Sequence, residues 1–165
     1  MATSMIGVLS VFFIYNVFGT RQKIFMGDSG SLLLGYLLTA FVFHFCELNA
    51  YHMVPAALQM DAAPAVAICV LTIPLFDMFR VCITRIKQCR SPFMPDKNHI
   101  HHLLLSTGLS HIQTTCVLLS LSLLFIGLGI LGRNWNIWLL LSVDFGIAAV
   151  LTLIIWRVIN KNKNA

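Results

Sequence analysis

The sequence predicts an all-α integral membrane protein, and its composition favours that fold class over a soluble one. Of the 165 residues, 58% are apolar and only 10% are charged, whereas soluble domains carry about 25% charged residues. The mean hydropathy is +0.85. A soluble domain of this size could not bury so many apolar side chains. The composition equally argues against a disordered chain and against a secreted disulfide scaffold.

Five apolar segments are long enough, or nearly long enough, to be membrane-spanning helices, each of which needs about 20 mostly apolar residues. The first segment is short, the second is close to full length, and the last two are full length. The segments are residues 4–19, 31–47, 62–79, 112–131 and 137–156. We therefore expect about five transmembrane helices in a single membrane domain, residues 1–165.

The basic residues predict how these helices are oriented. Ten of the eleven Lys and Arg residues follow the first, third and fifth spans, and the exception is Arg133. Because cytoplasmic loops are enriched in Lys and Arg, we expect the N-terminus outside, the C-terminus in the cytoplasm, and cytoplasmic loops at residues 20–30 and 80–111. The basic residues that give the net charge of +5 thus serve to orient the helices and to contact membrane lipids, so we expect no nucleic-acid partner.

The first cytoplasmic loop enters the second span through Gly27-Asp28-Ser29-Gly30-Ser31. A helix N-terminus exposes unpaired N–H groups and a partial positive charge, which stabilise a carboxylate and can also hold a phosphate. A hard cation would bridge the two anions, Mg²⁺ being the usual choice and Mn²⁺ the alternative. On the residues alone, simple capping of the helix is the favoured explanation of Asp28.

The second cytoplasmic loop contains three histidines within four residues, His99, His101 and His102. Imidazoles donate hydrogen bonds to phosphates and sugar hydroxyls, so the loop is a candidate anion-binding surface. Two alternatives stay open: a zinc site, although no Cys or Glu stands at a familiar zinc spacing, and a solvated loop that attracts acidic lipid head groups. The basic residues of the loop are Arg85, Lys87, Arg90 and Lys97.

Two carboxylates in or beside the predicted spans need partners. Asp77 lies at the inner end of the third span with Arg80 three residues later, so we expect a local ion pair. Asp144 lies near the middle of the fifth span, where a charge is costly. It is expected to face the helix bundle, to pair with a group on another helix or to be protonated. A small transporter that uses Asp144 is one functional hypothesis.

Two motifs on the predicted cytoplasmic side are specific enough to compare with known families. The first is F-M-G-D-S-G-S-L-L-L-G at residues 25–35. The second comprises P-L-F-D at 74–77, Arg85, S-P-F-M-P-D-K-N-H-I-H-H-L-L at 91–104 and G-L-S at 108–110. In this order they resemble the polyprenyl-phosphate N-acetylhexosamine-1-phosphate transferases. The H-I-H-H form resembles the branch that transfers N-acetylglucosamine 1-phosphate or a related sugar phosphate.

This resemblance implies an activity and a set of site residues. The family transfers an N-acetylhexosamine 1-phosphate, here expected to be N-acetylglucosamine 1-phosphate, from a cytoplasmic UDP-N-acetylhexosamine to undecaprenyl phosphate and releases UMP. The reaction is the first membrane step of cell-surface polysaccharide synthesis, on the cytoplasmic face of the bacterial inner membrane. By resemblance Asp28 is the catalytic Mg²⁺ ligand. The substrate-binding residues implied are Ser29, Arg85, His99, His101 and His102.

The chain is expected to correspond to the C-terminal half of such an enzyme. Family members usually have more spans, an adjacent aspartate pair and an N-x-x-D-G-x-D-G-like segment, and these 165 residues contain neither motif. We therefore expect the chain to be inactive by itself and to act with an N-terminal half or as a homodimer. The alternative hypothesis is a non-catalytic membrane binding or scaffold subunit that retains this fold.

Overall fold

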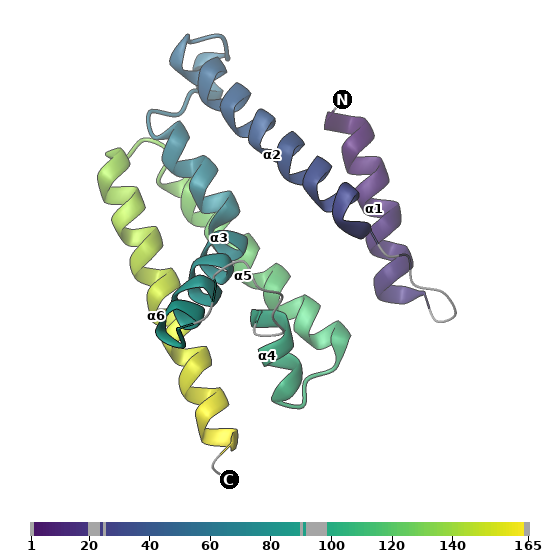
Figure 1. Ribbon diagram of the computed structural model, residues 1–165. Coiled ribbons are helices and arrows are strands. Elements are labelled where there is room, and N and C mark those ends of the chain that lie inside the picture. Colours follow the sequence, from purple (N-terminus) through teal and green to yellow (C-terminus); the bar gives the residue numbers. More distant parts are fainter. Residues whose placement is uncertain (1, 20–23, 25, 90, 92–98, 164–165) are drawn as a thin grey trace. The chain divides into compact units, whose positions relative to one another are not determined.

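The computed structural model describes residues 2–19, 24, 26–89, 91 and 99–163, and every regular element within them is a helix (Figure 1). The all-α prediction is confirmed. A short 3₁₀ helix, Ala56–Leu58, connects α2 to α3. The α-helices are α1 (Ala2–Phe18), α2 (Gly27–Ala50), α3 (Ala63–Lys87), α4 (Ile100–Ser106), α5 (His111–Leu131) and α6 (Ile137–Lys163).

Over the described residues, four helices are long and apolar enough to cross a membrane, namely α2, α3, α5 and α6 up to Arg157. The protein is therefore an integral membrane protein of the all-α class. The remaining predicted span corresponds to α1, which is apolar but has only 17 residues. At 1.5 Å per residue α1 reaches about 26 Å, a little less than the hydrocarbon core. The orientation of the helices stays a prediction.

The chain divides into two compact units, Met1–Phe41 and Val42–Ala165, and each is described by itself. In the first unit, the Asn16 side chain of α1 accepts a hydrogen bond of 2.9 Å from the Ile24 N–H. Gly27 then begins α2 with a φ of 68°. A residue with a Cβ rarely adopts this left-handed conformation, so a glycine at this position suits the sharp entry of the chain into α2.

The second unit is built around α3, which packs against α5 and α6, while α4 packs against α5 and α6 at the end of the bundle (Figure 1). Small side chains allow the close approach of α5 to α3. A Cβ added at Gly129 would lie 3.1 Å from the Cys69 Cβ, which explains why glycine suits this contact. The buried apolar core beside this contact consists of residues at the start of α3 and of one residue of α6, namely Ala62, Ala65, Val66, Cys69 and Leu140.

Asp144 is completely buried between α6 and α3. The Thr72 hydroxyl lies 3.0 Å and 2.8 Å from its two carboxyl oxygens and 3.0 Å from the Ile68 carbonyl oxygen. The predicted pairing of Asp144 with a group on another helix is therefore confirmed. Thr72 has a single proton, so both partners are satisfied together when Asp144 is protonated and donates to Thr72 while Thr72 donates to Ile68. Complete burial argues against an aqueous transport path at Asp144.

We expect Thr72→Val, which preserves the shape of the side chain, to lower the free energy of unfolding by about 1 kcal/mol, because hydrogen bonds between membrane helices contribute about 0.6 to 1.7 kcal/mol. Asp144→Asn should be milder, since an amide still donates and accepts. The measurement is equilibrium unfolding in mixed detergent micelles. Thr115→Val is the matched control, because the hydroxyl of the half-buried Thr115 donates to the His111 carbonyl group of its own helix. An equal loss in both threonine variants would contradict the prediction.

Candidate functional site

The predicted loop 80–111 contains two helical segments. Helix α3 continues through Arg80 and Arg85 and ends at Lys87, shortly before Cys89, whose φ is 55°. The short helix α4 was not foreseen, although Ile100, Leu103 and Leu104 have the i, i+3, i+4 spacing of an amphipathic helix. Ile100 and Leu104 are buried, whereas His101 and His102 are exposed. The helix therefore presents its histidines away from the core.

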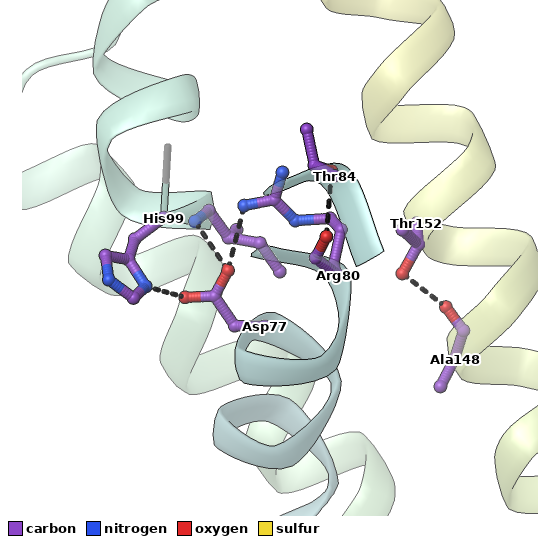
Figure 2. Close-up of polar contacts among 7 residues, drawn as sticks. Asp77, Arg80, Thr84, His99, Ala148 and Thr152 are labelled. Carbon is purple, nitrogen blue, oxygen red and sulfur yellow. Dashed lines mark hydrogen bonds and ion pairs between the residues drawn. The ribbon is translucent and has the colours of Figure 1, made fainter. Parts of the chain in front are cut away.

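Asp77, in the C-terminal half of α3, connects this helix to the start of α4. Its Oδ1 atom accepts hydrogen bonds from Arg80 Nη2 at 3.0 Å and from the Ile100 N–H at 2.9 Å, and its Oδ2 atom lies 3.0 Å from His99 Nδ1. Figure 2 shows the carboxylate between His99 and Arg80. The side chains of Asp77 and Arg80 are only 17% and 18% exposed. This set of four residues is hereafter the Asp77 cluster.

The ion pair between Asp77 and Arg80 confirms the expectation from their spacing. The contacts of Asp77 with His99 and Ile100 were missed, because they join residues 22 and 23 positions apart. A signal for them existed. Histidine is not one of the residues that commonly cap a helix, so the first N–H groups of a helix beginning at Ile100 would need an acceptor from elsewhere, and Asp77 was an available carboxylate.

The structure brings the three predicted histidines together. The ring centroids of His99 and His101 are 5.9 Å apart with the rings nearly parallel, and those of His101 and His102 are 4.1 Å apart. Partial burial lowers the pKa of His101 below its ordinary value of 6.5, and the neighbouring rings of His102 and His99 lower it further, while Asp77 acts in the opposite direction. His101 is therefore a neutral imidazole at neutral pH, with one N–H to donate to a ligand.

An apolar cavity of about 440 Å³ lies between α3, α4 and α6, beside the Asp77 cluster. Phe76, Leu103 and Trp156 are part of its wall. Two threonines of the wall, Thr84 and Thr152, donate their hydroxyl protons to carbonyl groups of their own helices, as Figure 2 shows, so the wall presents mainly apolar surface. Lys87 adds positive charge to the wall, whereas the charge of Arg80 is paired with Asp77.

The remaining predicted site residues lie in different environments. Arg85, on the last turn of α3, is only 8% exposed. Asp28 and Ser29 are exposed in the first turn of α2, where Ser31 donates a hydrogen bond of 2.9 Å to the Asp28 carbonyl group. They belong to the first unit, whereas the histidines belong to the second. The pairing of Asp28 with the histidines, and each predicted contact with a substrate, stay predictions.

The carboxylate of Asp28 is suited to be one ligand of a magnesium ion, but not part of a zinc site in the part of the chain that the structure describes. Among the described residues, no three His, Cys, Asp or Glu side chains come together as metal ligands, so this part of the chain offers no zinc cage. Mg²⁺ needs less from a protein, because it is usually bound by one or two carboxylates together with substrate phosphates and water. An exposed carboxylate on the first turn of a helix, as at Asp28, meets that requirement for one ligand.

Comparisons with known proteins identify relatives of this chain. No protein-family profile and no solved structure matches it. The undecaprenyl-phosphate alpha-N-acetylglucosaminyl 1-phosphate transferase of Yersinia pestis is 28% identical over 145 residues, which cover 85% of this chain and 37% of that protein. The protein of the same name from Haemophilus influenzae is 31% identical over 120 residues, covering 73% of this chain and 31% of that protein.

A third relative of this name, from Pasteurella multocida, is 31% identical over 127 residues, which cover 76% of this chain and 33% of that protein. The chain thus spans about a third of the length of the curated relatives it matches. These matches confirm the resemblance that the two motifs indicated. The chain is a membrane protein related, over that third, to the undecaprenyl-phosphate alpha-N-acetylglucosaminyl 1-phosphate transferases.

Proposed function

We propose that this chain forms part of a transferase that moves N-acetylglucosamine 1-phosphate from a UDP-sugar to undecaprenyl phosphate and releases UMP. The observation that carries the proposal is the group of three neighbouring imidazoles at the start of α4, held beside Asp77 of α3, in a chain whose relatives bear that name. In this proposal the active face is the cytoplasmic face of the bacterial inner membrane, where the predicted basic loops lie.

The chemistry requires neutralisation of charge and alignment of two phosphates more than it requires a strong base, because the attacking lipid phosphate is already an anion. His101 and His102 would donate hydrogen bonds to the diphosphate or the sugar of the donor, and Arg85 would add positive charge. Asp28, with Ser29 beside it, would hold Mg²⁺ or Mn²⁺. The ion would neutralise charge on the phosphate oxygens.

In this proposal the apolar cavity beside the Asp77 cluster holds the acceptor, undecaprenyl phosphate. An isoprenoid chain is apolar throughout, and its terminal phosphate is anionic, so it suits a wall of apolar side chains with Lys87 beside it. Burial of apolar surface stabilises such a complex by about 25 cal/mol per Å². In this arrangement the lipid phosphate would lie at the end of the bundle where the histidines are.

The activity is tested with a chimera in which this chain replaces the matching segment of the Haemophilus influenzae relative. Transfer of labelled sugar phosphate from UDP-N-acetylglucosamine to undecaprenyl phosphate is the readout, with the unmodified relative as the positive control. If the chimera is folded and inserted in the membrane but transfers nothing, the proposal is contradicted. A chimera that binds the nucleotide sugar without transferring it would favour the non-catalytic binding subunit.

We expect His101→Ala to weaken the binding of UDP-N-acetylglucosamine to the chimera about tenfold, because one hydrogen bond to a charged group is lost. The measurement is equilibrium dialysis with labelled nucleotide sugar. His111→Ala is the matched control, since His111 is an exposed histidine at the start of α5. An unchanged affinity in the His101 variant would mean that the histidine loop has a structural role only.

A further inference from the structure

We propose that Asp77 is a positioning residue for His99. Its carboxylate fixes the tautomer and the orientation of that imidazole, and it also holds the first residue of the helix that carries His101 and His102. The inference rests on the proposed function, since that function supplies the ligand toward which the histidines act. It concerns a residue whose interaction with Arg80 alone would have suggested nothing more than a local ion pair.

The tautomer of His99 follows from the hydrogen-bond donors and acceptors of the Asp77 cluster. An ionised carboxylate has only acceptor oxygens. Asp77 Oδ2 lies 3.0 Å from His99 Nδ1, so Nδ1 carries the proton of the neutral imidazole and Nε2 is the unprotonated nitrogen. The His99 side chain is 41% exposed. Nε2 is therefore the nitrogen that this partly exposed ring offers to a ligand, either to accept a hydrogen bond or to take up a proton.

The orientation follows from the other oxygen of the same carboxylate. Asp77 Oδ1 accepts from the Ile100 N–H at 2.9 Å and from Arg80 Nη2 at 3.0 Å. The first N–H groups of a helix have no partner within the helix, and seven residues are too few for a stable isolated helix. The carboxylate thus holds the start of α4 and the His99 ring together, and Arg80 holds the carboxylate.

Asp77→Asn distinguishes this role from simple packing, because the amide has almost the same shape as the carboxylate. Two donors, Ile100 N–H and Arg80 Nη2, face Oδ1, so the amide oxygen must keep that place. The NH₂ group of the asparagine then faces His99 Nδ1 and donates to it. Nδ1 must become the acceptor, and the proton of the neutral ring moves to Nε2. We expect the tautomer of His99 to be reversed.

The measurement is nitrogen NMR of the purified 165-residue chain in detergent micelles, with ¹⁵N-labelled histidine and the His99 signals assigned by their loss in His99→Gln. In the unsubstituted chain at a pH where His99 is neutral, Nδ1 should be the protonated nitrogen. Asp77→Asn should reverse the assignment, whereas Asp77→Glu should retain it because a carboxylate is still present. Asp61→Asn, at an exposed aspartate, is the matched control and should change nothing.

The second measurement is sugar-phosphate transfer by the chimera. We expect Asp77→Asn to lower kcat/KM for UDP-N-acetylglucosamine at least about tenfold, as the loss of a charge-assisted hydrogen bond implies, and Asp77→Glu to restore part of it. An unreversed tautomer in Asp77→Asn would overturn the inference, as would a reversed tautomer with full transfer. A third outcome separates the two proposals. If Asp77→Asn reverses the tautomer in the 165-residue chain but the unsubstituted chimera transfers nothing, the positioning of His99 is supported and the proposed function is contradicted.

Discussion

Asp28→Asn is expected to reduce sugar-phosphate transfer by the chimera by a factor of at least about 100, the cost of removing one electrostatic contact at a reacting centre. The carboxylate lies exposed on the first turn of α2, where we propose that it is a ligand of Mg²⁺. An amide is a far weaker ligand for this hard cation than a charged carboxylate. The measurement is transfer at saturating UDP-N-acetylglucosamine over a series of Mg²⁺ concentrations.

This substitution also decides between the two interpretations of Asp28. Asparagine has almost the same shape as aspartate and keeps a side-chain oxygen on the first turn of α2, so a purely structural role of Asp28 at the helix start predicts wild-type transfer. The metal-ligand role predicts lost transfer and unchanged stability. Asp61→Asn makes the same chemical change on the exposed surface of the second unit and serves as the control. Wild-type turnover by the Asp28→Asn chimera would end the metal-ligand interpretation.

Gly129→Leu is expected to lower the free energy of unfolding by about 3 kcal/mol, because overpacking of a close contact costs about 1–3 kcal/mol. A Cβ at this position would lie 3.1 Å from the Cys69 Cβ and 3.4 Å from Val66 Cγ1, so a leucine side chain would force α5 away from α3. That separation would also disturb the core formed by Ala62, Ala65 and Leu140. Unfolding in mixed micelles, followed by tryptophan fluorescence, is the measurement.

The same helix offers the matched control. Around Gly127, no neighbouring atom of the described residues lies within 4 Å of the position that a Cβ would occupy. Both substitutions gain the same helix propensity over glycine, about 1 kcal/mol, so this gain cancels in the comparison. We expect Gly127→Leu to be neutral or slightly stabilising. Equal stability of the two leucine variants would show that α5 does not approach α3 as closely as the structure indicates.

Hydropathy was sufficient to predict most of the fold. Long apolar runs predicted α2, α3, α5 and α6, because a bilayer imposes a minimum length on each spanning helix. Hydropathy could not predict the rotation of each helix about its axis. For this reason the sequence indicated that Asp144 has a partner on another helix, yet it did not identify Thr72, which is 72 residues away.

The candidate site was predictable only in part. Spacing alone indicated the pair of Asp77 and Arg80, since residues three apart are neighbours on a helix. The contact between Asp77 and His99 depends on how the chain returns after α3, and no local pattern encodes that path. The relation between Asp28 and the histidines depends on the placement of two units that are each described by themselves, so it stays a prediction from the family resemblance.

The anchoring of α4 by Asp77 has a consequence for how the three histidines respond to the lipid environment. A helix of seven residues has little stability of its own, and here its first amide depends on a side chain of α3, the helix against which α5 and α6 pack. A tilt or vertical shift of α3, as hydrophobic mismatch produces, would therefore be transmitted to the imidazoles. If the proposed function holds, bilayer thickness would therefore change the positions of the imidazoles relative to a bound nucleotide sugar.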